Sequence, residues 1–464
     1  MMRGLWLPAA RALAADYAQT RATVNAALGA RTATGSAAPA DSAMPATAAT
    51  PAVRYEPSGL GPVPLFFLAG SVFAVSAGYG ALMPLLPAWL LQHMPDASPA
   101  QIARHAGFLT GVYAAGLAVA APLWGLLSDH LGRPRVLIAG LTGYVLSLLL
   151  LLPSTGGMAT LYGLRAAAGL FAASVLPLVP ALVAAHTPKA LRARRFAWLG
   201  AASLLGFLLG PGLYAAGSML ASSGASGAAA GPAAAVLVIV LPAVLSAVMM
   251  LGLAVTLPAQ EISTQEDSAE PAATDGGGIT ALLWLSAAVM FVLSGFETGI
   301  VLQDQQHASL SPQQVALMFA QCSLVMLGVN ALLFFTPLLE RVSPPAIMAA
   351  GALGGSAGLA VLALNQSTPG MFIGISLTAA GTGLMLPAIS YLAAGTQRRE
   401  LGVTMGALAA AGGVGQTLGS AAGGWLFGLA GPVSFAWLML PLLLTLALLP
   451  GQPSWRARAA APPQ

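Results

Sequence analysis

The sequence predicts an all-α membrane protein with twelve transmembrane helices in two pseudo-symmetric six-helix bundles. The first observation is compositional: 7% of the 464 residues are charged and 57% are apolar, and the mean hydropathy is +0.81. Soluble globular proteins carry about 25% charged residues, so this chain cannot cover a soluble surface. The second observation is a series of long apolar runs, and the third is a similarity between the two halves.

Composition also excludes several functional classes. The net charge is +4, but the basic residues lie in short connectors and form no patch for nucleic acid. The one cysteine, Cys322, excludes an intrachain disulfide and a cysteine-based metal cluster, and the five histidines have no metal-ligand spacing. The one lysine, Lys189, follows Pro188, whereas a phosphate-binding P-loop needs Gly-Lys. We therefore expect no enzyme, no metal, no cofactor and no nucleic-acid partner.

The apolar part of the chain lies between two tails. Residues 1–60 are rich in Ala, Thr, Ser and Pro and hold no run long enough to cross a bilayer. We predict a disordered cytoplasmic N-terminal tail there, although a true start at Met44 would remove most of it. Residues 451–464 form the predicted cytoplasmic C-terminal tail.

Twelve apolar runs follow one another, each close to the length of about 20 residues that a spanning helix needs. They are too long, and alternate too little, for barrel strands. An acidic connector at 258–278 separates a predicted N-terminal bundle, 61–257, from a C-terminal bundle, 279–450, and is the predicted cytoplasmic linker. The runs lie at 63–91, 105–127, 134–154, 160–186, 196–220, 234–257, 279–303, 314–338, 345–364, 370–394, 402–429 and 433–450.

The two halves share a spacing of turn and helix-start residues, which indicates an internal repeat. A Ser-Pro pair suited to begin a helix precedes both the second and the eighth run. Such parallel repeats place a substrate site near the midplane between the halves. Three residues after the second run have counterparts 211 residues later: Asp129 with Glu340, Pro134 with Pro345, and Gly140 with Gly351.

Basic residues predict the orientation in the membrane. If both termini are cytoplasmic, the outer connectors hold only Arg104. That asymmetry follows the positive-inside rule and predicts an integral multi-pass protein of the plasma membrane, in a bacterium the inner membrane. The inner connectors and the C-terminal tail then hold Arg133, Arg135, Lys189, Arg192, Arg194, Arg195, Arg341, Arg398, Arg399, Arg456 and Arg458.

The loop between the second and third runs carries a concentrated charge pattern. Asp129 ends one predicted helix, and Arg133 and Arg135 begin the next, so the charges can clamp two helix ends together. Gly125 and Gly132 allow the backbones to approach closely. We interpret these five residues as a latch that favours one conformation. The simpler alternative is a charged turn that only fixes topology.

This loop resembles the signature between helices 2 and 3 of the major facilitator superfamily, and the similarity covers about residues 60–450. The resemblance implies the twelve-helix fold of that family and transport by alternating access. Some positions depart from the family pattern, namely His130, Leu131 and Pro134. The matching positions are Gly125, Leu127, Ser128, Asp129, Gly132, Arg133 and Arg135.

Arg165 lies inside the fourth run, where a buried arginine is costly and tends to mark function. The segment 165–169 resembles the family's helix 4 motif, whose arginine is linked to proton coupling in efflux members. Ala168 replaces the glutamine of that motif. The alternative is an arginine whose side chain extends to the outer interface.

Gly206, Gly210 and Pro211 form a second motif, in the fifth run. Small residues four apart permit tight helix packing, and proline bends a helix. The segment resembles the helix 5 motif of drug–proton antiporters, although Tyr214 and Ala215 replace its later glycines. The alternative is generic small-residue packing.

Glu297 is the one acidic residue well inside an apolar run. An intramembrane carboxylate is a candidate proton site, and together with Arg165 it forms the predicted coupling pair. It could instead pair with a cationic substrate or be hydrated from outside. Other polar or aromatic residues at membrane depth are candidates for the substrate cavity, with interhelical bonding or packing as the alternative: Tyr79, Tyr113, Gln321 and Gln416.

These expectations combine into a function. They describe a secondary transporter, resembling the multidrug and tetracycline branch of the family, that exports a small amphipathic organic molecule in exchange for protons. Its partners are that substrate, protons and the lipid bilayer, and it functions as a monomer. The rivals are a proton-coupled uptake symporter for a sugar, amino acid or organic acid, and a non-transporting membrane receptor.

Overall fold

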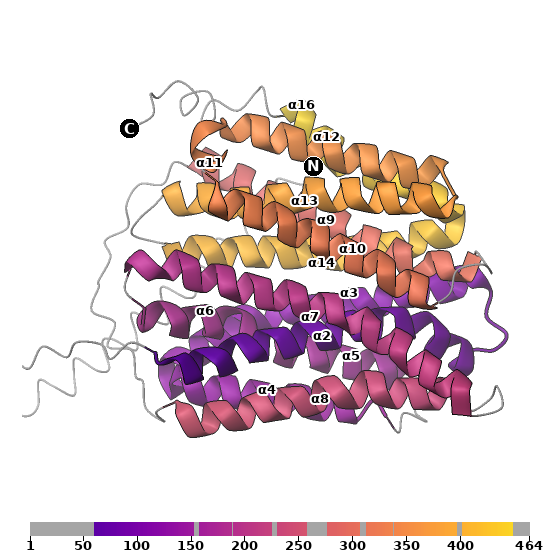
Figure 1. The fold of residues 1–464 in the computed structure, drawn as a ribbon, viewed down its shortest axis with the longest axis horizontal. Helices are drawn as coiled ribbons and strands as arrows, with labels where there is room; N and C mark the ends of the chain where they lie inside the picture. The colour runs from indigo at the N-terminus through magenta and orange to yellow at the C-terminus, as the bar shows by residue number, and fades with distance from the viewer. Residues whose placement is uncertain are drawn as a thin grey trace, which may run out of the picture. The chain divides into compact units, whose positions relative to one another are not determined.

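Helices account for the regular structure of this chain. A computed structural model describes residues 60–152, 157–187, 189–224, 230–257, 276–306, 312–336, 338–396 and 401–448, and no strand occurs among them. These residues belong to one compact unit, and their helices lie side by side along a common direction (Figure 1). Most of the two predicted tails and of the linker falls outside these ranges.

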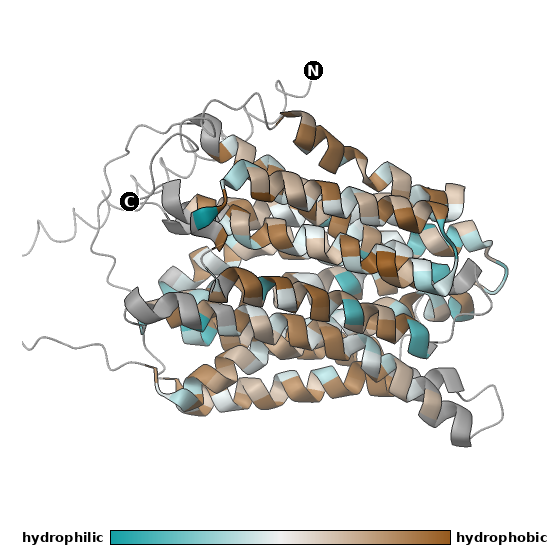
Figure 2. Cartoon of the chain, turned by 45° about the horizontal axis from the view of Figure 1, so that its top comes forward, coloured by the Kyte–Doolittle hydropathy of each residue, from teal (hydrophilic) through white to brown (hydrophobic). Residues whose placement is uncertain are grey.

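The surface of these helices is suited to lipid. Hydrophobic residues recur along most of the helices (Figure 2), and many large ones are exposed; Val255, Phe335 and Leu364 are each more than four-fifths exposed. In water such a surface would be unfavourable, whereas hydrocarbon tails solvate it well. The chain is an integral membrane protein.

The N-terminal half, which we define as helices α2 to α8, follows the predicted order. The start of α3 confirms the expected capping box, because Gln101 N donates to Ser98 Oγ at 3.3 Å and Ser98 N donates to Gln101 Oε1 at 2.8 Å. Gly132 separates α3 from α4 with a φ of 87°, a conformation that favours glycine. The helices are α2 (Pro62–His93), α3 (Pro99–Leu131), α4 (Arg133–Leu149), α5 (Met158–Ala172), α6 (Val175–Ala185), α7 (Lys189–Gly224) and α8 (Ala230–Thr256).

The C-terminal half, α9 to α16, has the same succession of long helices. The described part of its last predicted span, 433–450, is divided into two short helices, which follow a 3-10 turn. The elements are α9 (Gly276–Gln306), α10 (Pro312–Phe335), α11 (Leu338–Arg341), α12 (Pro344–Leu364), α13 (Thr368–Thr396), α14 (Leu401–Ala430), the 3-10 turn η1 (Gly431–Val433), α15 (Ser434–Leu438) and α16 (Leu440–Leu448).

Ten helical stretches among the described residues are long and apolar enough to cross a membrane. The expected number of twelve is consistent with that count for two reasons. Helix α4, with 17 residues, is slightly too short to be included. The stretch Ala407–Leu448 has 42 residues and contains both of the last two predicted spans, separated at Gly431, whose φ is 55°.

The predicted continuous helix at 160–186 is wrong in one detail, because the chain breaks between α5 and α6. Pro177 has no N–H for the carbonyl of Ala173, and its ring crowds that carbonyl. Ser174 N instead donates to Phe171 O at 3.1 Å. The indole of Trp124 on α3 donates to Leu170 O at 2.7 Å and so ties this break to a neighbouring helix.

The internal repeat reappears in the helix contacts. In the N-terminal half, α2 packs on α7 and α8, α3 on α5, and α4 on α5 and α8. In the C-terminal half, α9 packs on α14 and α16, α10 on α13, and α12 on α13 and α16, which are the corresponding pairs. Across the halves, α3 meets α14 and α7 meets α10, and these two contacts correspond to each other as well.

The α3–α14 contact is a close backbone approach at one end of α3. A Cβ on Gly111 would lie 3.0 Å from Thr417 O, and a Cβ on Gly428 would lie 2.8 Å from Ala100 O. Gly107 and Gly424 meet in the same way. This seam, residues 100–118 of α3 against 413–428 of α14, follows the connector that we predict to be on the outer side of the membrane.

Candidate functional site

Glu297 of α9 lies inside the protein, with 7% of its surface exposed. The alternative of an externally hydrated acid is therefore wrong. It is the one buried carboxylate among the described side chains. Its Oε2 accepts a long hydrogen bond of 3.5 Å from the hydroxyl of Tyr79, which belongs to α2 in the other half.

Tyr79 connects several of the predicted site residues. Its hydroxyl accepts a hydrogen bond of 3.3 Å from Gln416 Nε2 on α14. Its ring contacts the ring of Tyr113 on α3 in a tilted arrangement, with centroids 5.3 Å apart, and stacks on the ring of Phe207 on α7 at 5.9 Å. These two aromatic contacts restrict the position of the Tyr79 side chain.

Arg165 of α5 is fully buried, so the alternative of a side chain that extends to the interface is wrong. Its Cζ lies 4.7 Å from the centre of the Tyr113 ring, a cation–π contact. Nε, Nη1 and Nη2 donate no hydrogen bond to any of the described residues. A buried guanidinium without hydrogen bonds is costly, so this conformation holds Arg165 at the expense of stability.

The structure thus brings five predicted residues into one central cluster: Tyr79, Tyr113, Arg165, Glu297 and Gln416. One buried positive and one buried negative charge stand at its two ends, joined through the rings of Tyr113 and Tyr79. Gln416 and Glu297 come from the C-terminal half, and the other three from the N-terminal half. A change in the charge of Glu297 therefore alters a hydrogen bond that crosses the boundary between the halves.

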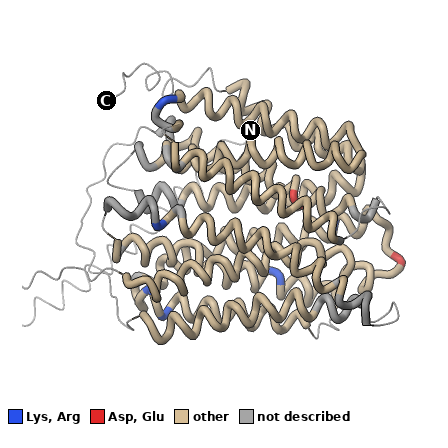
Figure 3. The backbone as a smooth tube through the Cα atoms, in the orientation of Figure 1, with Lys and Arg blue, Asp and Glu red and all other residues tan. Residues whose placement is uncertain are grey.

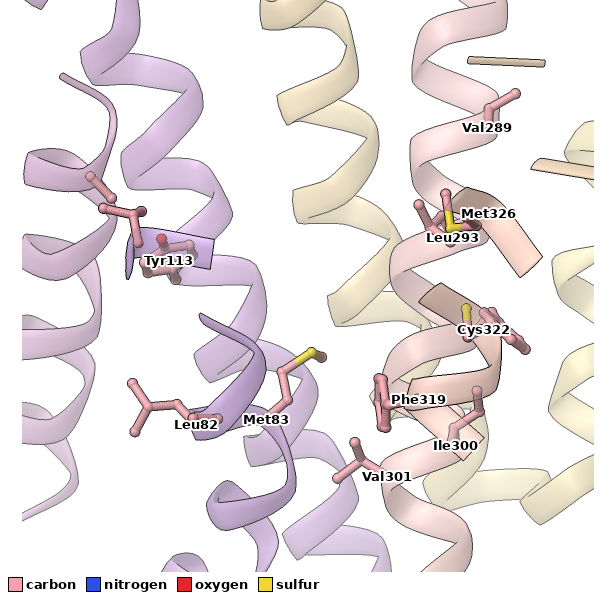
Figure 4. Close-up of a cluster of buried hydrophobic side chains, with 14 of the residues drawn as sticks. Leu82, Met83, Tyr113, Val289, Leu293, Ile300, Val301, Phe319, Cys322 and Met326 are labelled. Carbon is pink, nitrogen blue, oxygen red and sulfur yellow. The ribbon is translucent and has the colours of Figure 1, made fainter. Parts of the chain in front are cut away.

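Apolar and aromatic side chains surround the cluster. The Phe207 ring meets Phe319 of α10 across the boundary, with centroids 5.7 Å apart. Met83 of α2 extends toward Phe319, and Cys322 lies further along α10 (Figure 4). These contacts were not predicted, although Phe207 lies within the Gly206–Pro211 motif. The boundary between the halves is therefore apolar beside the cluster.

Three other predicted site residues, Gln321, Gly206 and Gly210, lie outside this cluster and make packing contacts. Gln321 Nε2 donates to Phe372 O at 3.1 Å and also to Ser376 Oγ, so it joins α10 to α13 as in the alternative interpretation. Gly206 and Gly210 lie against α2, where a Cβ on Gly210 would be 2.7 Å from Ala77 O. Both glycines therefore permit tight packing within the N-terminal half.

The 125–135 loop is only partly described. The side chain of Asp129 lies outside the described residues, so its pairing with Arg133 stays a prediction. Arg133 is half-buried and Arg135 is exposed. The close helix approach that we expect at Gly125 is not seen in this conformation, since a Cβ there would meet no heavy atom within 4 Å. Nearby Leu123 is 59% exposed.

Charged residues are otherwise rare within the helices. Figure 3 shows most of the coloured arginines near one end of the helices. The residues that the structure describes contain no group of three or more His, Cys, Asp or Glu that could hold a metal ion. His105 and Tyr162 form a contact that sequence reasoning missed, with His105 Nδ1 2.9 Å from the Tyr162 hydroxyl oxygen.

Known proteins with similar sequences are resistance proteins. The chain is 36% identical over 140 residues to the class B tetracycline resistance protein of Escherichia coli. The aligned segment covers 29% of this chain and 32% of that protein. It is 28% identical over 158 residues to multidrug resistance protein 2 of Bacillus subtilis, covering 34% and 37%. It is 28% identical over 160 residues to the quinolone resistance protein NorA of Staphylococcus aureus, covering 32% and 37%. The chain thus spans about a third of the length of the curated relatives it matches.

Solved structures show the same fold. A partially occluded, inward-open form of the xylose transporter XylE from Escherichia coli matches with a TM-score of 0.66 and 13% identity, over 84% of this chain and 97% of XylE. The human organic anion transporter MFSD10 matches with a TM-score of 0.64 and 20% identity, over 84% of this chain and all of that chain. A family model described as Major Facilitator Superfamily matches residues 68–333 and 283–461, most of the chain. The chain belongs to the Major Facilitator Superfamily.

Proposed function

We propose that this protein exports a small amphipathic organic molecule from the cytoplasm in exchange for protons. The observation that carries the proposal is Glu297, a buried carboxyl at the boundary between two repeated halves, contacted by Tyr79 from the opposite half. A carboxyl is the group there that can alternately hold and release a proton. The tetracycline, multidrug and quinolone resistance proteins among the relatives support export and an amphipathic substrate.

The charge of the cluster gives the exchange its logic. With Glu297 ionised, the buried charges of Glu297 and Arg165 sum to zero; with Glu297 protonated, one positive charge remains. A cationic substrate that binds while Glu297 is ionised produces the same total charge as a bound proton. Either a cationic substrate or a proton can then neutralise Glu297, and the two bind alternately. Such mutually exclusive binding is the basis of antiport.

The conformation fits one step of this cycle. The seam between α3 and α14 closes the predicted outer side, while Gly125 at the other end of α3 has no close neighbour. With the predicted orientation, this is the state in which substrate enters from the cytoplasm and Glu297 releases its proton there. Rocking of the halves would open the outer side and close the 125–135 loop.

Transport into inverted membrane vesicles tests the proposal. We would impose an acidic interior and measure uptake of tetracycline, a fluorescent quinolone and ethidium, in vesicles with and without the protein. An exporter accumulates at least one of these probes as protons leave, and the accumulation ends when the gradient is collapsed with an uncoupler. Vesicles with Glu297→Gln should resemble vesicles without the protein.

The same vesicles separate export from proton-coupled uptake. An uptake symporter would release a preloaded substrate together with the protons, the opposite direction of movement. Release driven by the acidic interior would overturn the export proposal, and proton-driven accumulation by Glu297→Gln would overturn the assignment of the proton site.

A further inference from the structure

Tyr79 belongs to the N-terminal half, but both hydrogen bonds of its hydroxyl cross to the C-terminal half. One goes to Glu297 on α9 and the other comes from Gln416 on α14. The buried Tyr144 on α4 behaves differently: its hydroxyl donates to Val75 O on α2 at 3.3 Å, within one half. The ring contacts of Tyr79 lie within the N-terminal half, so it is its hydrogen bonds that depend on how the two halves are arranged.

The direction of these hydrogen bonds is set by chemistry. The amide nitrogen of Gln416 can only donate, so the oxygen of Tyr79 accepts there. The single hydroxyl proton of Tyr79 is then free for Glu297. A carboxylate accepts such a bond more strongly than a neutral carboxyl does, because the acceptor is charged. Protonation of Glu297 therefore weakens a link between the halves.

Few other groups compete for this role. Among the described side chains, the thiol of Cys322 on α10 is the titratable group besides Tyr79 that interacts electrostatically with Glu297. Helices α14, α15 and α16 and the turn η1 contain no titratable side chain, and α13 contains only Tyr391, near its C-terminal end. On α3, Tyr113 reaches the cluster through its ring contacts with Tyr79 and Arg165. The hydroxyl of Tyr79 is thus the hydrogen-bond donor to Glu297 in the described structure.

We infer that Tyr79 is the positioning residue that couples the protonation of Glu297 to the movement of the two halves. Its hydroxyl holds the ionised carboxylate of the C-terminal half against the N-terminal half, and protonation loosens that hold and favours rocking. The inference rests on the proposed function, because it takes Glu297 to be the proton site. Arg165 contacts the ring of Tyr113, which in turn contacts Tyr79. Its positive charge stabilises the ionised form of Glu297 at longer range.

The test uses the full-length protein in proteoliposomes and two readouts. Infrared difference spectra follow the C=O stretch of a protonated carboxyl as pH is changed, and the band missing in Glu297→Gln belongs to Glu297. The second readout is the yield of the disulfide that forms between cysteines introduced at Gly111 and Ala421, in a Cys322→Ser background. Their Cβ atoms would lie 3.7 Å apart across the α3–α14 seam, close to the separation in a disulfide.

Tyr79→Phe keeps the ring and removes the hydroxyl. Because that hydroxyl stabilises the ionised carboxylate, its loss should move the midpoint of the Glu297 band upward by about one pH unit. The cross-linking yield of the seam should also lose its dependence on pH. Tyr144→Phe, which removes a hydroxyl bond inside one half, is the matched control and should retain both the wild-type midpoint and the pH dependence. Both variants carry the same two cysteines, so pH changes the reactivity of their thiols equally, and a difference in yield between the variants has another cause.

Gln416→Met provides a second variant if Tyr79→Phe fails to fold, and should move the midpoint in the same direction by less. If Tyr79→Phe matches the wild type in both readouts, the inference is overturned while Glu297 remains the proton site. A moved midpoint with unchanged pH dependence of cross-linking overturns the coupling. If no titrating band is missing in Glu297→Gln, the proton site of the proposed function fails instead.

Discussion

Glu297 and Arg165 show how much a single side chain can cost in a membrane protein. Both are buried, and the described residues give Arg165 no hydrogen-bond partner and Glu297 one long one. Burial of polar groups with so few partners lowers the free energy of unfolding. Buried charges of this kind tend to mark functional sites, which is why we propose Glu297 and Arg165 as the proton-coupling pair.

Glu297→Gln should separate transport from proton coupling. The amide keeps the size of the side chain but cannot exchange a proton, so uphill accumulation driven by a pH gradient should vanish. Exchange of labelled for unlabelled substrate at equal concentrations should persist for an uncharged substrate, because it needs neither net proton movement nor the charge of Glu297. Both are measured by filtration of proteoliposomes. Loss of exchange in a folded variant would show that Glu297 is needed for substrate binding or for the movement itself.

Arg165→Gln should stabilise the protein while impairing its function. Removing a buried charge without hydrogen bonds should raise the unfolding temperature by a few degrees, as expected when a functional residue is kept at the expense of stability. Thermal unfolding in detergent measures the change, and Arg165→Lys, which keeps the charge, is the control. A lower unfolding temperature for the glutamine variant would mean that Arg165 makes stabilising contacts in other conformations of the protein.

The sequence was informative about which residues are unusual but not about their contacts. Tyr79 and Gln416 each lie near the middle of a long helix, so their depth could be predicted. Their hydrogen bond could not, because it depends on the rotation of α2 and α14 about their axes. Gln321 has the same depth and polarity, but it faces α13 and bonds there.

At the level of helices, glycines decide which faces can meet. Gly206 and Gly210 lie against α2. A Cβ added to Gly212, two residues after Gly210 on α7, would have no heavy atom of another segment within 4 Å. Apolar runs and glycine spacing therefore predicted that α7 packs closely. The break between α5 and α6 was not predicted, because the sequence has one uninterrupted apolar run there.

Gly210→Ala and Gly212→Ala form a matched pair in one helix. The methyl group of the first would press on the backbone of α2 and should lower the free energy of unfolding by about 1–3 kcal/mol. The second adds a methyl group in open space and should raise it by about 0.5–1 kcal/mol, since alanine is the better helix former. Thermal unfolding and the yield of monodisperse protein in detergent report both. Equal effects would mean that α2 and α7 are not in close contact.

At the scale of the molecule, a duplicated helix arrangement is the feature that the sequence predicted best. Residue correspondences 211 positions apart are matched by corresponding helix contacts in the two halves. The conformation was not predictable, because both states of a two-state transporter have the same sequence. The division into two bundles at 258–278 stays a prediction.

Cross-linking across the seam should lock the transporter. With cysteines at Gly111 and Ala421 in the Cys322→Ser background, oxidation should form a disulfide that holds the predicted outer side closed. Transport should fall to background and return on reduction, with the two single-cysteine variants unaffected by oxidant. Continued transport in the fully cross-linked protein would show that α3 and α14 need not separate during the cycle.

Helix α14 is confined on two sides at once. Gly415 and Gly419 lie against the backbone of α9, and Gly424 and Gly428 lie against that of α3. Every amino-acid replacement at a glycine codon adds at least one carbon, so the gene segment for α14 should tolerate almost no missense changes at these positions. A saturation library selected for transport should show depleted codons there and freedom at outward-facing Leu418, which is 57% exposed.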